Sequence, residues 1–140
     1  MTRRLIAVLF ALVLTRPAAA QDVVVVVNSA NAASSSTKAD VAALFLKHTT
    51  KWPDGSAAVC VDQGEGAAVR EAFSKKVLGK STSAVKAYWQ HQIFSGHDLP
   101  PVEKSGDQAV LDFVRTNPGA VGYVSPGTSL GSGVKALTVE

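Results

Sequence analysis

Five consecutive valines at 23–27 constrain the fold of this chain more than any other stretch. β-Branched side chains favour extended backbone, and a strand without alternating polar residues is typical of one that is covered on both faces. The run therefore predicts a strand in a sheet that has helices on both sides. Further strands are predicted at 57–61, 120–124 and 134–139.

Segments with helical spacing of their apolar residues alternate with these strands. Two of the predicted helices begin with a capping box, Thr37 with Asp40 and Ser105 with Gln108. Helices and strands in alternation predict an α/β fold with a small mixed β-sheet flanked by helices. The helices are expected to begin near residues 37, 67 and 105 and at a cap that is either Ser81 or Ser83, and the main loops lie at 28–36, 48–56, 97–104 and 125–133.

The first twenty residues have the pattern of a secretory signal peptide. Arg3 and Arg4 form a basic start, residues 5–14 are an unbroken apolar run, and three alanines stand at 18–20. The apolar run is about half the length of a membrane-spanning helix of roughly 20 residues. We therefore expect 1–20 to be removed on export. That leaves 21–140 as a single periplasmic or secreted domain without a transmembrane segment.

Removal of the leader changes the charge of the protein. The full chain has 14 Lys and Arg residues against 11 Asp and Glu residues. The leader takes away Arg3, Arg4 and Arg16 but no acid, so 11 basic residues remain against 11 acidic ones. A domain with zero net charge has no general attraction for nucleic acid or acidic membranes. We expect neither as a partner.

The sequence predicts no catalytic or metal site, and no cofactor. Cys60 is the only cysteine and lies in an apolar run, so we expect a buried and inert thiol. Residues 127–131 match the G-x-S-x-G nucleophile elbow, but that motif needs a helix after it, and here a strand is predicted. The three histidines have no metal-ligand spacing, and Trp52 is interpreted as a packing residue.

Residues 62–73, DQGEGAAVREAF, have the features of an anion site. A glycine-bracketed loop runs into an amphipathic helix, where free N–H groups and the positive end of the helix dipole meet. Two interpretations stay open. Either the backbone of this loop holds an anion, or the Glu65 carboxylate caps the helix in its place and stabilises it by about 0.3–1 kcal/mol. Arg70 is expected to face solvent or to pair with an acid. The candidate ligand-binding residues are Gly64, Glu65, Gly66, Ala67, Ala68, Val69 and Arg70, with Ser34, Ser35 and Ser36 nearby.

Four segments, in order, resemble the phosphate-type substrate-binding proteins of bacterial ABC importers. VVVVVN at 23–28 resembles the family's strand that ends in Asn, and VAALFLKHTTKWPDGS at 41–56 is similar to its IF-G-x-x-x-x-W-x-D segment. VDQGEGAAVREAF at 61–73 is similar to its R-x-x-G-S-G-T-R-x-x-F loop and helix, and NPGAVGYVS at 117–125 matches its t-x-G-A-I-G-Y-v strand. Full-size members have two lobes, and this chain is less than half that size. The resemblance therefore implies one lobe of a type II periplasmic binding protein.

The resemblance also implies that the chain binds an oxyanion, although some of the family's ligand-binding residues are missing here. In the family, an Arg of the loop clamps the oxyanion, and the Ser-Gly-Thr hydroxyls and amides donate to it. Alignment on Arg70 and Phe73 places two alanines and a valine, 67–69, at the Ser-Gly-Thr positions, and no cation stands at the clamp position. We expect an exported, non-enzymatic solute-binding-type domain that binds phosphate or another small oxyanion weakly. The alternative is a protein-interaction module that keeps the fold. Its partner would be an envelope protein or a second lobe supplied in trans.

Overall fold

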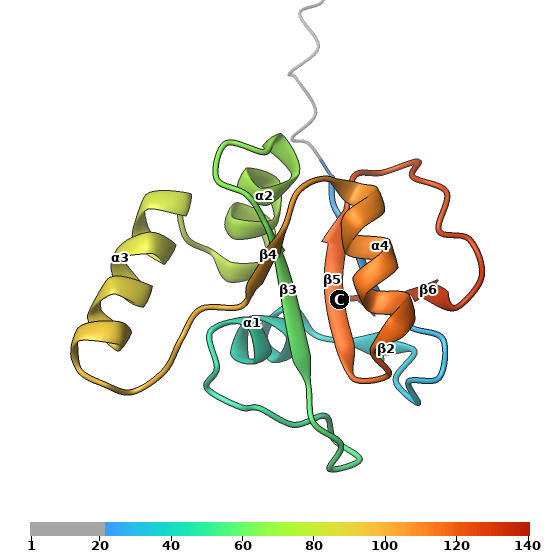
Figure 1. Ribbon diagram of the computed structural model, residues 1–140, viewed down its shortest axis with the longest axis horizontal. Helices are drawn as coiled ribbons and strands as arrows, with labels where there is room; N and C mark the ends of the chain where they lie inside the picture. Colours follow the sequence, from blue (N-terminus) through green and yellow to red (C-terminus); the bar gives the residue numbers. More distant parts are fainter. Residues whose placement is uncertain (1–21) are drawn as a thin grey trace, which may run out of the picture.

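The computed structural model describes residues 22–140, and the leader predicted at 1–20 lies outside them (Figure 1). Five strands form one mixed sheet: β1 (Val24–Asn28), β3 (Val59–Gln63), β4 (Val102–Lys104), β5 (Ala120–Val124) and β6 (Val134–Ala136). Their order across the sheet is β4-β3-β5-β1-β6. β1 runs antiparallel to β5 and β6, whereas β3 runs parallel to β4 and β5. The predicted small mixed sheet is confirmed.

The valine run occupies an interior strand, and its predicted burial on both faces is confirmed. β1 lies between β5 and β6, and Val26 and Val27 have no exposed surface. Successive side chains of a strand point to opposite faces of the sheet. Accordingly, Val25 and Val27 belong to one apolar cluster and Val26 to another. The strand extends to Asn28, whose side-chain amide donates to the Val114 carbonyl oxygen at 2.9 Å.

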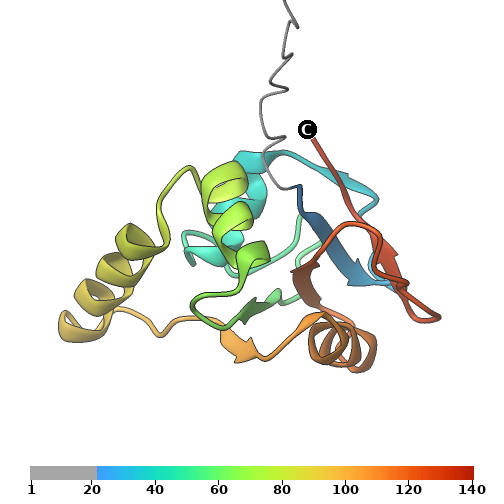
Figure 2. The same ribbon diagram turned by 90° about the horizontal axis from the view of Figure 1, so that it is seen from above.

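Helices cover both faces of the sheet (Figure 2). They are α1 (Lys38–Phe45), α2 (Ala68–Phe73), α3 (Thr82–Phe94) and α4 (Asp107–Thr116), and α2 continues into a π-helical turn, η1 (Ser74–Leu78). Val114 of α4 packs on the face that holds Val26. On the other face, Phe45 of α1 and Phe73 of α2 pack against Tyr123, with the last two rings stacked 4.1 Å apart. Among residues 22–140, no helix has the length and apolar character needed to cross a bilayer.

Most of the predicted helix starts are confirmed, but the capping box predicted for Ser105 with Gln108 is wrong. Thr37 and Ser81 each accept a hydrogen bond at 3.1 Å from the N–H group three residues further on. The N-cap of α4 is Gly106, with φ of 90°, and no side chain caps this helix. A capping side chain must belong to the N-cap residue itself. Ser105 stands one residue too early, so its predicted box with Gln108 does not form.

Two short strands lie in segments that were predicted as loops. β4 pairs with β3, and β2 (Ser35–Ser36) pairs with β7 (Thr138–Val139) in a separate two-stranded sheet. Neither strand has an apolar pattern that a sequence could reveal. Both form only because the fold brings a distant segment alongside them. The strand predicted at 134–139 is also divided. Leu137 donates to the Val25 carbonyl oxygen at 2.8 Å, and the chain then leaves the main sheet to pair with β2.

Candidate functional site

The turn predicted as an anion site follows the C-terminal end of β3 and leads into α2 (Figure 1). The N–H group of Ala67 donates to the Gly64 carbonyl oxygen at 3.2 Å and closes the turn. Gly66 has φ of 88°, a conformation that glycine adopts readily and that other residues rarely adopt. The glycines of this stretch therefore shape a tight loop immediately before the helix.

Glu65 does not cap α2, so this interpretation of the sequence is wrong. The N-cap residue is Ala67, and no side chain accepts a hydrogen bond from the helix start. The Glu65 carboxylate lies instead 3.6 Å from Nζ of Lys86 on α3, with more than half of each side chain exposed. Glu65 stands two positions before the N-cap, and its side chain extends to the neighbouring helix. No carboxylate therefore caps the start of α2.

Five N–H groups at this turn have no acceptor within the described part of the chain. They belong to Gly64, Glu65, Gly66, Ala68 and Val69, whereas that of Ala67 is used within the turn. The first N–H groups of any helix lack an intrahelical partner, and here no capping side chain replaces one. The turn thus offers unpaired backbone donors, but no hydroxyl or cation among residues 64–69.

Arg70 is buried beside the ends of β3 and β4. Its side chain is 6% exposed, and Nη1 donates to the Gln63 carbonyl oxygen at 2.9 Å and to Oε1 of Glu103 at 2.8 Å. Nη2 lies 3.8 Å from Oδ2 of Asp62. Burial works against the guanidinium charge, but the Asp62 and Glu103 carboxylates outweigh it and raise the pKa of Arg70. Of the two expectations for Arg70, pairing with an acid is confirmed, and a side chain that faces solvent is wrong. Its charge is therefore committed to two carboxylates of the protein.

A buried polar cluster under the turn was not predicted. The Tyr123 hydroxyl donates to Oδ1 of Asp62 and accepts from the Gln63 N–H group at 3.1 Å. Gln63 Nε2 donates to Oδ1 of Asp107 at 2.9 Å and to the Tyr123 carbonyl oxygen at 3.0 Å. Burial raises the pKa of Asp62, and the contacts with Tyr123 and Arg70 oppose that rise. The sequence held one signal of this cluster: Asp62 stands next to a predicted buried strand. A buried charge needs a partner, so an acid at this position indicates that polar or charged groups lie around it.

The serines of the candidate set lie away from the turn. Ser35 and Ser36 line a hollow of about 460 Å³ together with Trp52. Nε1 of Trp52 donates to the Gly119 carbonyl oxygen at 3.0 Å, just before β5 begins. β3 and β5 are parallel, so the turn after the end of β3 lies at the opposite end of the sheet. The structure therefore does not bring Ser34, Ser35 and Ser36 to the turn.

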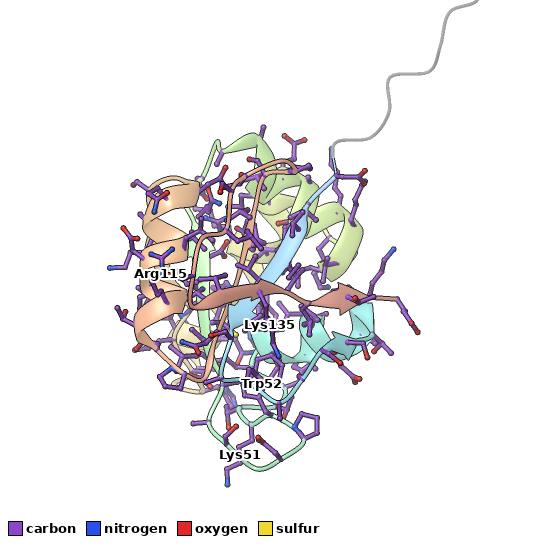
Figure 3. All side chains as sticks on the ribbon, turned by 90° about the vertical axis from the view of Figure 1, so that its right-hand side faces the viewer. Lys51, Trp52, Arg115 and Lys135 are labelled. Carbon is purple, nitrogen blue, oxygen red and sulfur yellow. The ribbon has the colours of Figure 1, made fainter. Side chains whose placement is uncertain are left out.

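The tryptophan turn is a packing feature. The Trp52 N–H group donates to the Ser56 carbonyl oxygen at 2.8 Å, and that of Gly55 donates to the Trp52 carbonyl oxygen at 2.9 Å. Trp52 is 4% exposed, while its neighbour Lys51 points outward from the connection (Figure 3). The interpretation of Trp52 as a packing residue is confirmed.

The structure also places the two other candidates for reactive chemistry, Cys60 and Ser129. Burial raises the pKa of Cys60 to about 12, so its thiol stays protonated, as predicted. Ser129 lies in the loop between β5 and β6, where no helix follows it. Within residues 22–140, no group of His, Cys, Asp and Glu residues is arranged to hold a metal ion.

Comparison with known proteins identifies the family. Residues 11–139 match the family model of the PBP superfamily domain, so the chain belongs to this family. No curated protein matches the chain significantly.

Solved structures of phosphate-transport proteins share the fold. An ABC-type phosphate transport receptor from Vibrio cholerae superposes with a TM-score of 0.65 at 19% identity, over 85% of this chain and 46% of that one. A protein from Clostridium perfringens, described as a phosphate ABC transporter substrate-binding protein with bound phosphate, gives a TM-score of 0.66 at 17% identity, over 85% and 45% of the two chains. The chain spans less than half the length of these neighbours, which is consistent with one lobe.

Proposed function

We propose that the mature chain is an exported, non-catalytic solute-binding-type domain that holds phosphate or a similar small oxyanion weakly at the 62–69 turn. The observation that carries this proposal is the set of five backbone N–H groups without an acceptor among the described residues. N–H groups at the start of a helix are natural donors to a phosphate oxygen. The phosphate bound in the Clostridium perfringens neighbour supports this class of ligand.

The charges around the turn predict weak binding. Arg70 is committed to Asp62 and Glu103, so it adds little positive potential at the turn. Lys86 and Glu65 are both well exposed, and solvent and salt screen each of them. Backbone dipoles are then the main source of attraction. We expect a dissociation constant for phosphate on the order of 1 mM, which corresponds to about −4 kcal/mol.

Removal of one donor tests this site. Ala68→Pro deletes an N–H group at the first helical position, where proline is tolerated. The preceding residue, Ala67, already has φ of −67° and ψ of 127°, which suits a following proline. We expect phosphate to shift the amide resonances of residues 65–69 in the natural protein, and its affinity to fall about tenfold in Ala68→Pro. Titration followed by NMR measures both.

A matched control separates loss of a donor from an effect of proline on the fold. Thr82→Pro makes the same change at the first position of α3, after Ser81, and should leave phosphate affinity unchanged. If the amides of 65–69 do not move at about 20 mM phosphate, twenty times the expected constant, the ligand-binding proposal is wrong.

The exposed carboxylate beside the turn should weaken anion binding. Glu65→Gln removes a negative charge near the N–H groups and is expected to strengthen phosphate affinity about threefold, as judged from Coulomb repulsion in water. The Lys86 contact that it breaks is a surface pair, so the free energy of unfolding should change by less than about 0.5 kcal/mol. Phosphate titration and urea unfolding of one preparation measure the two effects. A weaker affinity in Glu65→Gln would contradict this prediction.

The alternative function is a protein-interaction module, with an envelope protein or a second lobe in trans as partner. One observation favours it. Of the five large apolar side chains that are exposed among the described residues, four fall within 93–102. Capture from an envelope extract, with the natural domain and Phe94→Lys as parallel baits, tests this function. A protein retained by the first bait and lost from the second supports it, and equal retention on both contradicts it.

A further inference from the structure

α3 stands apart from the rest of the molecule in both ribbon views (Figures 1 and 2). Of its 13 residues, only Val85 and Trp89 are buried. These two side chains lie four residues apart, on the single face that packs against the protein. Tyr88 and Lys86 also contact the protein, through the Leu46 carbonyl oxygen and Glu65, but the side of the helix opposite Val85 and Trp89 is exposed.

The face of α3 that points away from the protein carries a regular stripe. Ala84, Ala87, His91 and Phe94 are all exposed and follow one another at intervals of three, four and three residues. This is the spacing of a helix–helix seam. Phe94, at the C-terminal end of the stripe, is 92% exposed, whereas the N-terminal end carries only the two alanines.

A stripe with a large side chain at one end and small side chains at the other can pack against a second copy of itself that runs in the opposite direction. If two α3 helices pack antiparallel about a two-fold axis near residue 89, position 94 faces position 84 of the other copy, and position 91 faces position 87. The large ring at one end then meets the two small residues at the other. An interface about a two-fold axis uses the same patch on both molecules, which this arrangement satisfies.

The charges near α3 agree with this arrangement. Lys80, two residues before the helix, makes no ion pair within residues 22–140, while Asp98, four residues after it, is partly exposed and pairs with Lys47 at 3.3 Å. Antiparallel packing brings Lys80 of each copy to the end where Asp98 of the other lies. The 11 basic and 11 acidic residues of the chain after residue 20 leave no net charge to keep two copies apart.

We propose that two copies of this chain associate through α3, antiparallel, with each Phe94 packed over the partner's Ala84 and the partner's Ala87. A stable interface buries roughly 800 Å² on each partner, which a helix about 20 Å long barely supplies. We therefore expect a dissociation constant on the order of 10 µM. This inference rests on the interaction-module function and not on the anion site.

Sedimentation of the mature domain from about 5 to 500 µM tests the association, a range that spans the expected constant. The natural protein should change from monomer to dimer over this range. Phe94→Lys should raise the dissociation constant more than about thirtyfold, the loss expected for an interface hot spot. A lysine in the last turn suits the helix dipole, so the fold is preserved. Gln108→Lys, with the same charge change on α4, should dimerise normally. A natural protein that stays monomeric, or equal effects of both substitutions, would overturn the proposal.

Cysteine cross-linking tests the direction of packing. Two preparations, Ala87→Cys and His91→Cys, should form a disulfide-linked dimer when they are mixed under mild oxidation, because these positions face one another in the antiparallel pair. Neither preparation should cross-link efficiently alone, because the two like positions are about 6 Å apart along the axis, in addition to the separation of the helices. Buried Cys60 does not compete. Cross-linking of Ala87→Cys with itself would overturn the antiparallel arrangement. Phosphate titration of Phe94→Lys keeps this result separate from the anion site, whose affinity should not change.

Discussion

Replacement of Arg70 by methionine is expected to lower the free energy of unfolding by about 3–5 kcal/mol at pH 7. The guanidinium lies between two carboxylates and a carbonyl oxygen, and the side chains of Arg70 and Asp62 are 6% and 11% exposed. Methionine fills a similar volume but leaves Asp62 buried without its cation. Removal of one partner of a buried pair is costly because the other charge stays desolvated. Urea unfolding measures the difference from the natural protein.

The effect of Arg70→Met should become smaller in acid. Burial raises the pKa of Asp62 even with Arg70 present, and loss of the cation raises it further. The folded variant then binds the proton more tightly than the unfolded chain does. Its penalty is complete above the raised folded-state pKa and disappears below the ordinary pKa of about 4 in the unfolded chain. The difference between natural protein and variant should therefore fall as the pH is lowered from 7 to about 4.

Two further variants show whether the buried pair is responsible. Adding Asp62→Asn to Arg70→Met should recover part of the lost stability, because the amide oxygen still accepts from Tyr123 and carries no charge. Lys75→Met breaks an exposed pair with Glu71 on the same helical segment and should cost less than about 0.5 kcal/mol. A loss in Arg70→Met that matches the loss in Lys75→Met, or that does not vary with pH, would contradict this account of Asp62.

Gly119→Ala is expected to destabilise the domain by about 3 kcal/mol. A Cβ at this position would lie 2.1 Å from the backbone carbonyl oxygen of Ala57, and no side-chain rotation relieves a clash with backbone. The Gly119 carbonyl oxygen also accepts from the Val59 N–H group and from Nε1 of Trp52, each at 3.0 Å. A shift that relieves the clash would disturb both bonds, and with them the start of β3 and the tryptophan turn. Thermal or urea unfolding measures the loss.

A second glycine provides the control for this substitution. Gly64→Ala adds the same methyl group at a position with no atom within 4 Å of the new Cβ and without a positive φ. Its free energy of unfolding should stay within about 0.5 kcal/mol of the natural value. Equal stabilities of the two variants would show that the close approach at Gly119 does not limit the fold.

Local patterns were sufficient for the parts of the fold that depend on local physics. The valine run predicted a strand buried on both faces because β-branching and the lack of polar alternation both act within a few residues. Thr37 was recognisable as a cap because the hydrogen bond spans three residues, whereas the choice between Ser81 and Ser83 was left open and the structure shows Ser81. The prediction for Ser105 was wrong by one position. The N-cap residue of α4 is Gly106, and only a side chain of the N-cap residue itself could have capped the helix.

In the candidate site, local sequence patterns predicted the loop but not the contacts that its side chains make. The glycine loop before a helix was predicted from the sequence, and the structure contains it. The direction of Glu65 was not visible, because its partner, Lys86, stands on another helix. The serines at 34–36 and the turn belong to opposite ends of the sheet, and only the parallel pairing of β3 with β5 decides this.

By itself, the sequence determined the α/β class, strands β1 and β5, the approximate positions of β3 and β6, most helix starts, the glycine loop before α2 and the family resemblance. These depend on periodicity, on backbone preferences and on short ordered motifs. Only the tertiary structure decided that β2 and β4 exist, that 134–139 divides between two sheets, and that Arg70 lies buried between Asp62 and Glu103. The physical reason is the same in each case. A short edge strand, a buried charge and an unpaired N–H group are defined by partners that the fold brings from distant parts of the chain.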